Sequence, residues 1–476
     1  MFKAMHKWHK WIGLAIFIPI VLWGLSGLLH PTLRLTKPVI GVHKLTPVPL
    51  DIRMVAFDPD AIMKLNDIAQ VRNIRIITMD GRHYYRLNLT NSEIRYFDLV
   101  TADELIHGEQ RYAEYLARKY LKDEQFGVFN SHRVTEFNDE YMPINRFLPV
   151  WRVNFTRDDG LRLYVDTESG RLAASVNDLR ADLLWWFGAL HNWSYLDKAN
   201  SPRIIIFLLA MLAMFILGLT GIVLYGLRYK CLTKSVSKEP QRNTAYYHRT
   251  VGVFISLSML MFSFSGGMHV WHKFTPDDRH LRTVKDNFHS NDLRIGLRQA
   301  FDIVEQQGPV KALSLVNISK EPYYRFALME GSPAASYVHS QTGELLAKAD
   351  ALYAQQLASQ IAGLETTQID TVKPITRFSS EYGFIDRRLP VMLVRFSTEG
   401  NPAYYVDLAT GKLAAMVNDS KRFEKFTFRM FHKWRFADAL SKNGRDAIIA
   451  VFILLNVLVV LLGVIMYLSK RSRKTD

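Results

Sequence analysis

The sequence has 476 residues, of which 49% are hydrophobic, and a formal net charge of +15. In a soluble protein this charge would suggest a nucleic-acid partner, but the apolar residues gather in long uncharged stretches, so we expect no nucleic acid. The single cysteine, Cys231, excludes structural disulfides, cysteine zinc sites and haem attached through Cys-x-x-Cys-His.

Four stretches of the chain are almost free of charged residues. Each is close to the roughly 20 residues that a helix needs to cross the hydrocarbon core of a bilayer. A helix in a soluble core is usually shorter and carries a polar face. We therefore predict four transmembrane helices around the uncharged stretches 11–29, 204–227, 251–270 and 447–468.

Basic residues lie beside the ends of these stretches. Lys3, Lys7 and Lys10 precede the first, further basic residues fill the short connection 228–242, and four more follow the last stretch at 470–474. Short basic segments stay in the cytoplasm. The charge pattern predicts a multi-pass protein of a bacterial inner membrane, with both termini inside and two long segments outside.

The two halves of the sequence repeat each other. His248 follows His9 by 239 residues within similar surroundings, and His432 follows His191 by 241, because two residues enter near Ser332. We interpret the repeat as a tandem duplication whose copies lie parallel in the membrane. The matching segments are 8–14 with 247–253, 26–30 with 265–269, 84–86 with 323–325, 164–172 with 405–413, and 191–193 with 432–434.

The two outer segments have the pattern of small α+β folds. Apolar and polar residues alternate in short runs, as in half-buried antiparallel strands. We predict strands at 73–78, 84–88, 94–99, 151–155 and 161–166 around a helix at 110–120, and strands at 323–328, 336–339, 392–396 and 403–407 in the second copy. Aromatic, amphipathic stretches at 182–191 and 423–434 are expected to lie along the outer membrane surface.

These patterns divide the chain into ten parts. The predicted order is transmembrane helix 1 (1–31), first outer domain (32–180), interfacial helix (181–201), transmembrane helix 2 (202–228), cytoplasmic loop (229–245), transmembrane helix 3 (246–271), second outer domain (272–420), interfacial helix (421–444), transmembrane helix 4 (445–469) and cytoplasmic tail (470–476).

Six of the 15 histidines occupy equivalent places in the two copies: His9 with His248, His30 with His269, and His191 with His432. His9 and His30 share one predicted helix, and His248 and His269 share another. In both helices the two histidines are 21 residues apart. At ~100° and 1.5 Å per residue they lie within ~60° of one helix face and ~31 Å apart, about one hydrocarbon thickness. Each of these helices is therefore expected to have one histidine near the inner membrane surface and one near the outer surface.

Paired imidazoles on facing helices are the usual axial ligands of an electron-transfer haem. Gly13 and Gly252 near the inner histidines, and Gly27 and Gly266 near the outer ones, would let a porphyrin approach the backbone. The plainer interpretation is that such histidines are interfacial residues. The repeat register favours haem ligation, and the sequence does not choose partners among the four outer histidines.

The residues that carry these patterns resemble the PepSY-associated transmembrane helix family, which includes iron-regulated membrane proteins and siderophore reductases. The resemblance rests on Trp8–Leu14 with Ser26–His30, and on the outer patterns Trp151–Phe155 and Val165–Leu172. It implies a membrane α-helical protein with four transmembrane helices and two α+β PepSY-like extracytoplasmic domains.

The resemblance also implies an oxidoreductase. Such a protein holds two or three haems b through His9, His248, His30, His269, His191 and His432, and carries electrons outward to a ferric siderophore or another iron complex. It needs no catalytic acid, base or nucleophile. No flavin or nicotinamide domain is recognisable in the cytoplasmic parts, so the electrons are expected from a separate cytoplasmic donor or from quinol.

Two other functions fit parts of the pattern. PepSY-like domains could bind peptides or restrain a protease outside the membrane, with the helices as anchors and a strand edge as the binding surface. A transporter of the iron complex is the third possibility. It is disfavoured because four helices leave little room for a pathway and none has an acidic residue in its middle.

Overall fold

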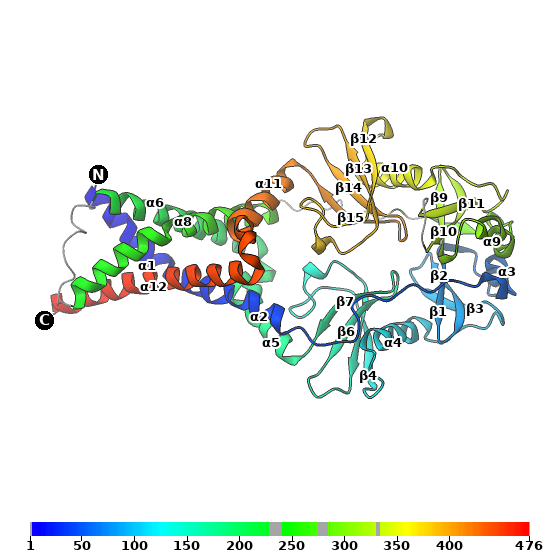
Figure 1. Ribbon diagram of the computed structural model, residues 1–476, viewed down its shortest axis with the longest axis horizontal. Coiled ribbons are helices and arrows are strands. Elements are labelled where there is room, and N and C mark those ends of the chain that lie inside the picture. Colours follow the sequence, from blue (N-terminus) through cyan, green and yellow to red (C-terminus); the bar gives the residue numbers. More distant parts are fainter. Residues whose placement is uncertain (1, 228–239, 275–283, 285, 330–333, 476) are drawn as a thin grey trace. The chain divides into compact units, whose positions relative to one another are not determined.

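The computed structural model describes residues 2–227, 240–274, 284, 286–329 and 334–475. The chain forms two compact units, each built from segments that are far apart in the sequence. The helical unit contains Met1–Lys37, Leu179–Pro276 and Ser420–Asp476, and the outer unit contains Pro38–Asp178 and Asp277–Asp419 (Figure 1). The basic loop and Cys231, predicted to be cytoplasmic, lie largely outside the described residues.

Four long helices make up the helical unit: α1 (Phe2–Gly27), α6 (Asn200–Leu227), α8 (Pro240–Phe274) and α12 (Ser441–Thr475). Each contains a stretch that is long and apolar enough to cross a membrane, which confirms the four predicted spans. Helix α1 packs against α6 and α12, and α8 packs against the same two helices. Helices α1 and α8, which carry the repeated histidines, are therefore opposite one another in the bundle.

Short segments outside the spans complete the helical unit. Helix α2 (Leu29–Leu35) follows α1. Before the second span come α5 (Asp178–Phe187), the π-helical turn η3 (Gly188–Asn192) and the 3₁₀ segment η4 (Ser194–Ala199). Before the fourth span come the matching α11 (Asp419–Thr427), π-helical turn η9 (Phe428–His432) and 3₁₀ segment η10 (Arg435–Leu440). These are the two segments that the sequence predicts as aromatic interfacial helices.

The outer unit contains one large sheet to which both outer segments contribute. Its strand order is β11-β10-β9-β1-β2-β3, with β8 paired to β1. The central pairing is antiparallel and brings Arg75 of β1 opposite Ser314 of β9. The strands are β1 (Gln70–Met79), β2 (Arg82–Leu89), β3 (Ile94–Asp98), β8 (Phe288–His289), β9 (Val310–Ile318), β10 (Glu321–Leu328) and β11 (Ala335–His339).

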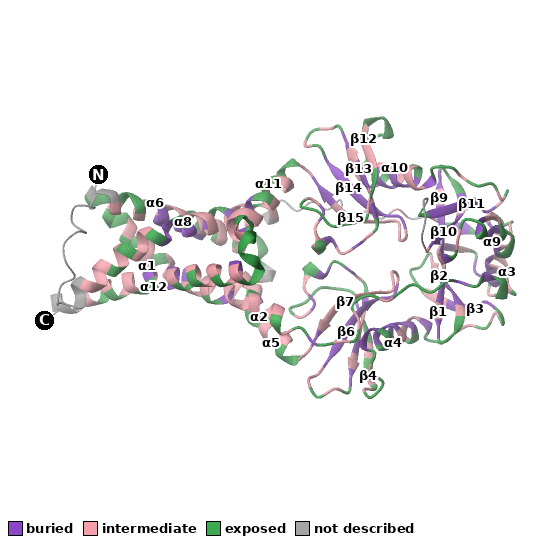
Figure 2. Ribbon diagram, viewed as in Figure 1, coloured by how far each residue is buried: buried purple, intermediate pink, exposed green. Residues whose placement is uncertain are grey.

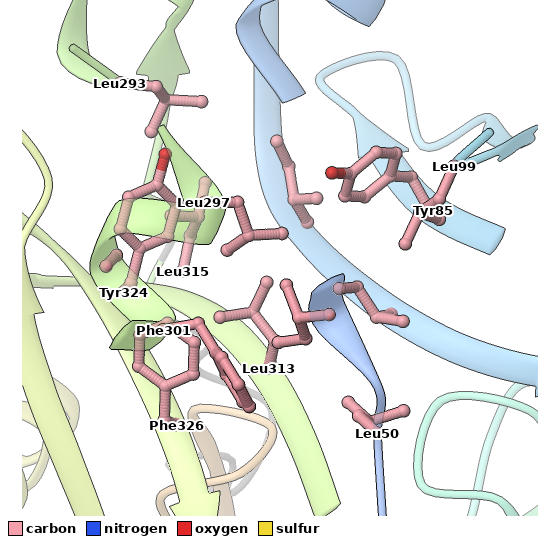
Figure 3. Close-up of a cluster of buried hydrophobic side chains, with 14 of the residues drawn as sticks. Leu50, Tyr85, Leu99, Leu293, Leu297, Phe301, Leu313, Leu315, Tyr324 and Phe326 are labelled. Carbon is pink, nitrogen blue, oxygen red and sulfur yellow. The ribbon is translucent and has the colours of Figure 1, made fainter. Parts of the chain in front are cut away.

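One face of this sheet buries a core shared by the two outer segments. Tyr85 and Leu87 of the first segment belong to the same apolar cluster as Tyr324 and Phe326 of the second (Figure 3). Helices α3 (Pro59–Leu65) and α9 (Leu297–Glu305) supply further side chains to it. The outer segments, which the sequence divides into two domains, are thus held together by a common sheet and a common core.

Each outer segment also forms its own four-stranded antiparallel sheet and a covering helix. The first sheet has the order β4-β5-β6-β7 and the second the order β12-β13-β14-β15. Tyr164 lies opposite Ala174 in the first, and Tyr405 lies opposite Ala415 in the second, which is the 241-residue offset of the sequence repeat. The elements are α4 (Gly108–Leu121), β4 (Val128–Val134), β5 (Val150–Phe155), β6 (Arg162–Asp166), β7 (Arg171–Val176), α10 (Ala349–Ala362), β12 (Ile369–Ile375), β13 (Val391–Phe396), β14 (Ala403–Asp407) and β15 (Lys412–Val417).

The predicted strands and the helix at 110–120 are all confirmed, with small shifts of their ends. Strands β4, β7, β8, β9, β12 and β15 were not predicted. Of these, β4 and β12 are edge strands with several exposed residues, so the alternation that marks a half-buried strand is weak in them. Buried residues are concentrated in the sheets and their covering helices (Figure 2).

Candidate functional site

The predicted inner histidines lie together in the helical bundle. The ring centres of His9 on α1 and His248 on α8 are 6.4 Å apart, and the ring planes are nearly perpendicular, at 76°. Both side chains are partly buried between helices. The packing of α1 and α8 against the same two neighbours accounts for this meeting, because it leaves their inward faces opposite one another.

The two inner rings are held by hydrogen bonds through the same nitrogen atom. His248 Nδ1 lies 2.9 Å from the main-chain oxygen of Val459, which can only accept, so this nitrogen carries the proton. His9 Nδ1 lies 2.8 Å from Oγ1 of Thr220, whose own hydroxyl donates to main-chain oxygens one turn earlier. His9 Nδ1 is therefore also the donor. In a neutral imidazole both rings then carry their lone pair on Nε2.

The separation of the two ring centres fits a pair of imidazoles on opposite sides of one haem iron. Two metal–nitrogen bonds of about 2 Å each, plus the distance from each ring centre to its own nitrogen, give a separation of roughly 6 Å. The observed 6.4 Å matches that value. Donation of the other ring nitrogen to an oxygen atom is the usual way in which ligating histidines are oriented.

Glycines adjoin both inner rings, although they are not the predicted ones. A Cβ atom added at Gly463 of α12 would lie 3.2 Å from His248 Cε1, and one added at Gly221 of α6 would lie 3.8 Å from His9 Cε1. The predicted Gly13 and Gly252 instead adjoin aliphatic side chains of neighbouring helices at 3.8 and 3.6 Å. The space beside the rings is thus provided by helices α6 and α12.

At the other end of the bundle, equivalent serines hold two of the outer histidines. His191 Nδ1 lies 3.0 Å from Oγ of Ser26, and His432 Nδ1 lies 3.3 Å from Oγ of Ser265. Both serines are fully buried, and both hydroxyls donate to main-chain oxygens of their own helix. The histidines are therefore the donors, and their neutral rings again carry the lone pair on Nε2.

The backbone is unusual where these two histidines occur. Each lies in the last two residues of a π-helical turn, a rare conformation that is frequent at functional sites. Trp193 and Trp434, which follow within two residues, have left-handed backbones with φ of 51° and 46°. This conformation is uncommon for a bulky residue and persists only where the surrounding structure enforces it.

A phenylalanine separates the two outer histidines within each copy. Phe187 stacks on His191 at 4.8 Å and contacts His30 edge-on at 5.7 Å. Phe428 stacks on His432 at 4.5 Å and contacts His269 at 4.8 Å. Burial lowers the pKa of His432, and His191, His269 and His30 lie near enough to lower it further. All four outer histidines therefore gather at one end of the bundle.

The remaining two outer histidines differ from each other. His269 Nδ1 lies 2.7 Å from a carboxylate oxygen of Glu424, and the His269 side chain is 41% exposed. In the first copy Leu183 occupies the equivalent place, and His30 is exposed. Neither has the buried serine partner of His191 and His432. Among the described residues no group of three or more potential metal-ligating side chains occurs, and a haem iron requires only two.

The sequence analysis did not predict the hydrogen-bond partners of the histidines. Ser26 and Ser265 stand in the repeated motif that ends in His30 and His269, so their repetition was a usable indication. Nothing in the sequence distinguishes Thr220, or the main chain at Val459, from the rest of an apolar helix.

The fold is that of a multi-pass membrane protein, with four helices long and apolar enough to cross a membrane and a separate α+β unit. Residues 106–312 match the family model described as the PepSY-associated TM region, which confirms the resemblance seen in the sequence motifs. No curated protein matches the chain.

Proposed function

We propose that this protein is a b-haem electron carrier that reduces ferric iron, in particular ferric siderophores, on the outer side of a bacterial inner membrane. The proposal rests above all on the meeting of His9 and His248, whose rings are 6.4 Å apart with both Nδ1 atoms bonded to oxygen. Residues from opposite copies of the repeat meet there, as expected of parallel duplicated units around a common axis.

The residues divide into an inner and an outer ligand set. His9 and His248 would hold the inner haem, and His191 and His432 would hold the outer one. His30 and His269 are the candidates for a third haem. Thr220, the Val459 carbonyl and the two serines would fix the ring orientations through Nδ1.

A bound haem supplies a one-electron carrier whose potential depends on its ligands and their hydrogen bonds. Reduction of ferric iron requires no nucleophile or general acid from the chain. The chain's own role is then to place two such carriers near opposite membrane surfaces and to exclude water between them. The charge pattern predicts that the inner haem lies near the cytoplasm. A separate cytoplasmic donor would deliver electrons to it, or quinol would do so within the membrane.

A pyridine haemochrome assay on purified full-length protein tests the proposal. We expect about two haems b per chain, reducible with dithionite and reoxidised on mixing with a ferric siderophore. The reoxidation should be slow with a gallium-loaded siderophore, which has a similar shape but accepts no electron. A preparation without Soret and α-band changes between its oxidised and reduced forms overturns the proposal.

A non-redox function is favoured by one observation in the outer unit. Within the described part of the chain strand β4 pairs only with β5, and Phe129 on it is 75% exposed, so its other edge is available to an added peptide strand. Under this alternative, replacing the six histidines together leaves peptide binding intact and the protein contains no haem. Loss of haem with the same replacements favours the redox function.

A further inference from the structure

Three arginines and one serine form a row across the middle of the large sheet of the outer unit. Arg75 of β1 is opposite Arg86 of β2 on one side and opposite Ser314 of β9 on the other. Ser314 is in turn opposite Arg325 of β10. Directly opposite residues project to the same face of a sheet, with Cβ atoms about 5 Å apart. The row Arg86–Arg75–Ser314–Arg325 therefore shares one face.

The row lies at a seam between the two outer segments. Residues on either side of Arg75 and Ser314 in their strands, such as Ile74 and Leu313, point into the shared apolar core on the opposite face. On the arginine face the apolar residues belong to two separate clusters, one around α4 and one around α10. The middle of the row is thus flanked by two cores and belongs to neither.

Like charges on directly opposite residues are destabilising unless counter-ions offset them. Arg86 has such a counter-ion, because it lies 3.3 Å from the carboxylate of Glu109. The equivalent acid in the second copy is Asp350, which is one methylene shorter. It accepts from Tyr337 at 2.7 Å, and Arg325 donates its Nε to the same tyrosine at 3.0 Å. Arg325 forms no ion pair with any described residue.

Arg75 likewise has no carboxylate partner among the described residues. Its one hydrogen bond goes to the main-chain oxygen of Glu168. The carboxylate of Glu168 accepts a hydrogen bond from Lys412. The nearby Asp407 forms an ion pair with Arg388 at 2.9 Å. Burial lowers the pKa of Arg75, although Glu168 acts in the opposite direction. The nearest acids are therefore already engaged by other cations.

The residue between the two arginines is a hydroxyl donor without a partner. Ser314 is 3% exposed, and its Oγ has no hydrogen-bond partner among the described residues. A buried hydroxyl that lacks a partner costs about 1–3 kcal/mol. Ser314 also stands where the first copy has Arg75, so the second copy has a short hydroxyl side chain in place of a third long cation at this point of the row.

We propose that Arg75, Ser314 and Arg325 form a binding site for an oxyanion, a carboxylate or phosphate group carried by a small molecule. Two guanidinium groups flanking a hydroxyl match such a group, because guanidinium donates paired hydrogen bonds to planar or tetrahedral oxygens. The anion would supply the negative charge that Arg75 and Arg325 lack among the described residues. It would also accept a hydrogen bond from the Ser314 hydroxyl. The site lies within the outer unit and does not depend on haem.

Binding of inorganic phosphate and of citrate to the full-length protein tests this site. Calorimetric titrations at constant ionic strength, with chloride as the background anion, should show saturable binding of at least one of the two. The stronger ligand distinguishes a phosphate group from a carboxylate. Arg75→Gln and Arg325→Gln should each weaken binding about tenfold or more, since each removes a charged hydrogen-bond donor. Arg298→Gln, an exposed arginine on α9, is the matched control and should change nothing.

Two substitutions at residue 314 separate a specific site from general positive charge. Ser314→Ala nearly keeps the volume and removes the donor, so it should weaken binding while the protein still folds, as judged by its thermal unfolding. Ser314→Arg adds a cation, but its long side chain would occupy the place of the anion between Arg75 and Arg325, so it should abolish binding. Stronger binding by Ser314→Arg, equal effects of Arg298→Gln and Arg75→Gln, or no saturable binding by the unmodified protein overturns the proposal.

Discussion

The inner and outer ends of the helical bundle hold histidines in different ways. At the inner end, two histidines meet directly, and their Nδ1 atoms bond to unlike acceptors, a threonine hydroxyl and a main-chain oxygen. At the outer end, His191 and His432 bond to equivalent serines, and phenylalanines separate each of them from a second histidine. At the inner end the repeat is thus kept only in the histidines. At the outer end it is kept in the histidines and in their hydrogen-bond partners.

This difference follows from where the histidines lie in the chain. His9 and His248 are part of spanning helices, so the packing of four helices is enough to bring them together. His191 and His432 lie outside the spans, on π-helical turns, and are joined to the bundle by hydrogen bonds from their Nδ1 atoms to Ser26 of α1 and Ser265 of α8. The inner site therefore depends on helix packing and the outer site on local hydrogen bonds.

The largest expected effect concerns the inner pair. His9→Ala and His248→Ala should each remove the whole inner haem, because a ring on one side of the iron alone leaves the metal half-ligated. Reduced-minus-oxidised spectra and the haem-to-protein ratio would show the same loss for both. His289→Ala, on the outer unit, serves as the control. Two spectrally different losses would show that the two histidines do not share a metal.

The second effect separates the outer histidines. His191→Ala and His432→Ala should remove the outer haem, whereas His30→Ala and His269→Ala should retain it, because only the first two rings have buried hydroxyl partners. The haem content of the four variants decides this. If His30→Ala or His269→Ala loses the outer haem while His191→Ala keeps it, the ligand assignment at this end is wrong.

A smaller effect is expected from the serines. Ser26→Ala and Ser265→Ala should weaken retention of the outer haem about 10–100-fold, as removal of outer-shell partners of metal ligands usually does. The inner haem should be unaffected, which its separate spectrum and midpoint potential would show. Ser26→Thr keeps the hydroxyl and should restore retention. An equal loss in the Thr variant would point to packing rather than to the hydrogen bond.

The smallest effect compares two glycines beside the inner rings. Gly463→Ala places a methyl group 3.2 Å from His248 Cε1, so the ring must shift, at a cost of about 1 kcal/mol. Gly221→Ala places one at an ordinary contact distance of 3.8 Å from His9 Cε1 but 3.2 Å from Oγ of Ser256, so the serine side chain must shift while the His9 ring and the inner haem should be unaffected. For both variants, the measurements are the spectrum of the inner haem and the temperature at which that haem is lost. Equal behaviour of the two variants would mean that the His248 ring has freedom to move.

The sequence by itself determined the features that depend on local composition and on repetition. Apolar length alone predicts the four spans, and strand alternation predicts most of the outer strands, because both patterns reflect the surroundings of neighbouring residues. The repeat also singled out the six histidines, since duplication keeps equivalent positions recognisable without any knowledge of contacts.

Only the tertiary structure decided which residues meet. The pairing of β1 with β9, the acceptors Thr220 and Val459, and the row of arginines beside Ser314 each join residues more than 200 positions apart. Such contacts depend on strand register and helix rotation. A shift of one residue in either would turn the side chains elsewhere without altering the local pattern.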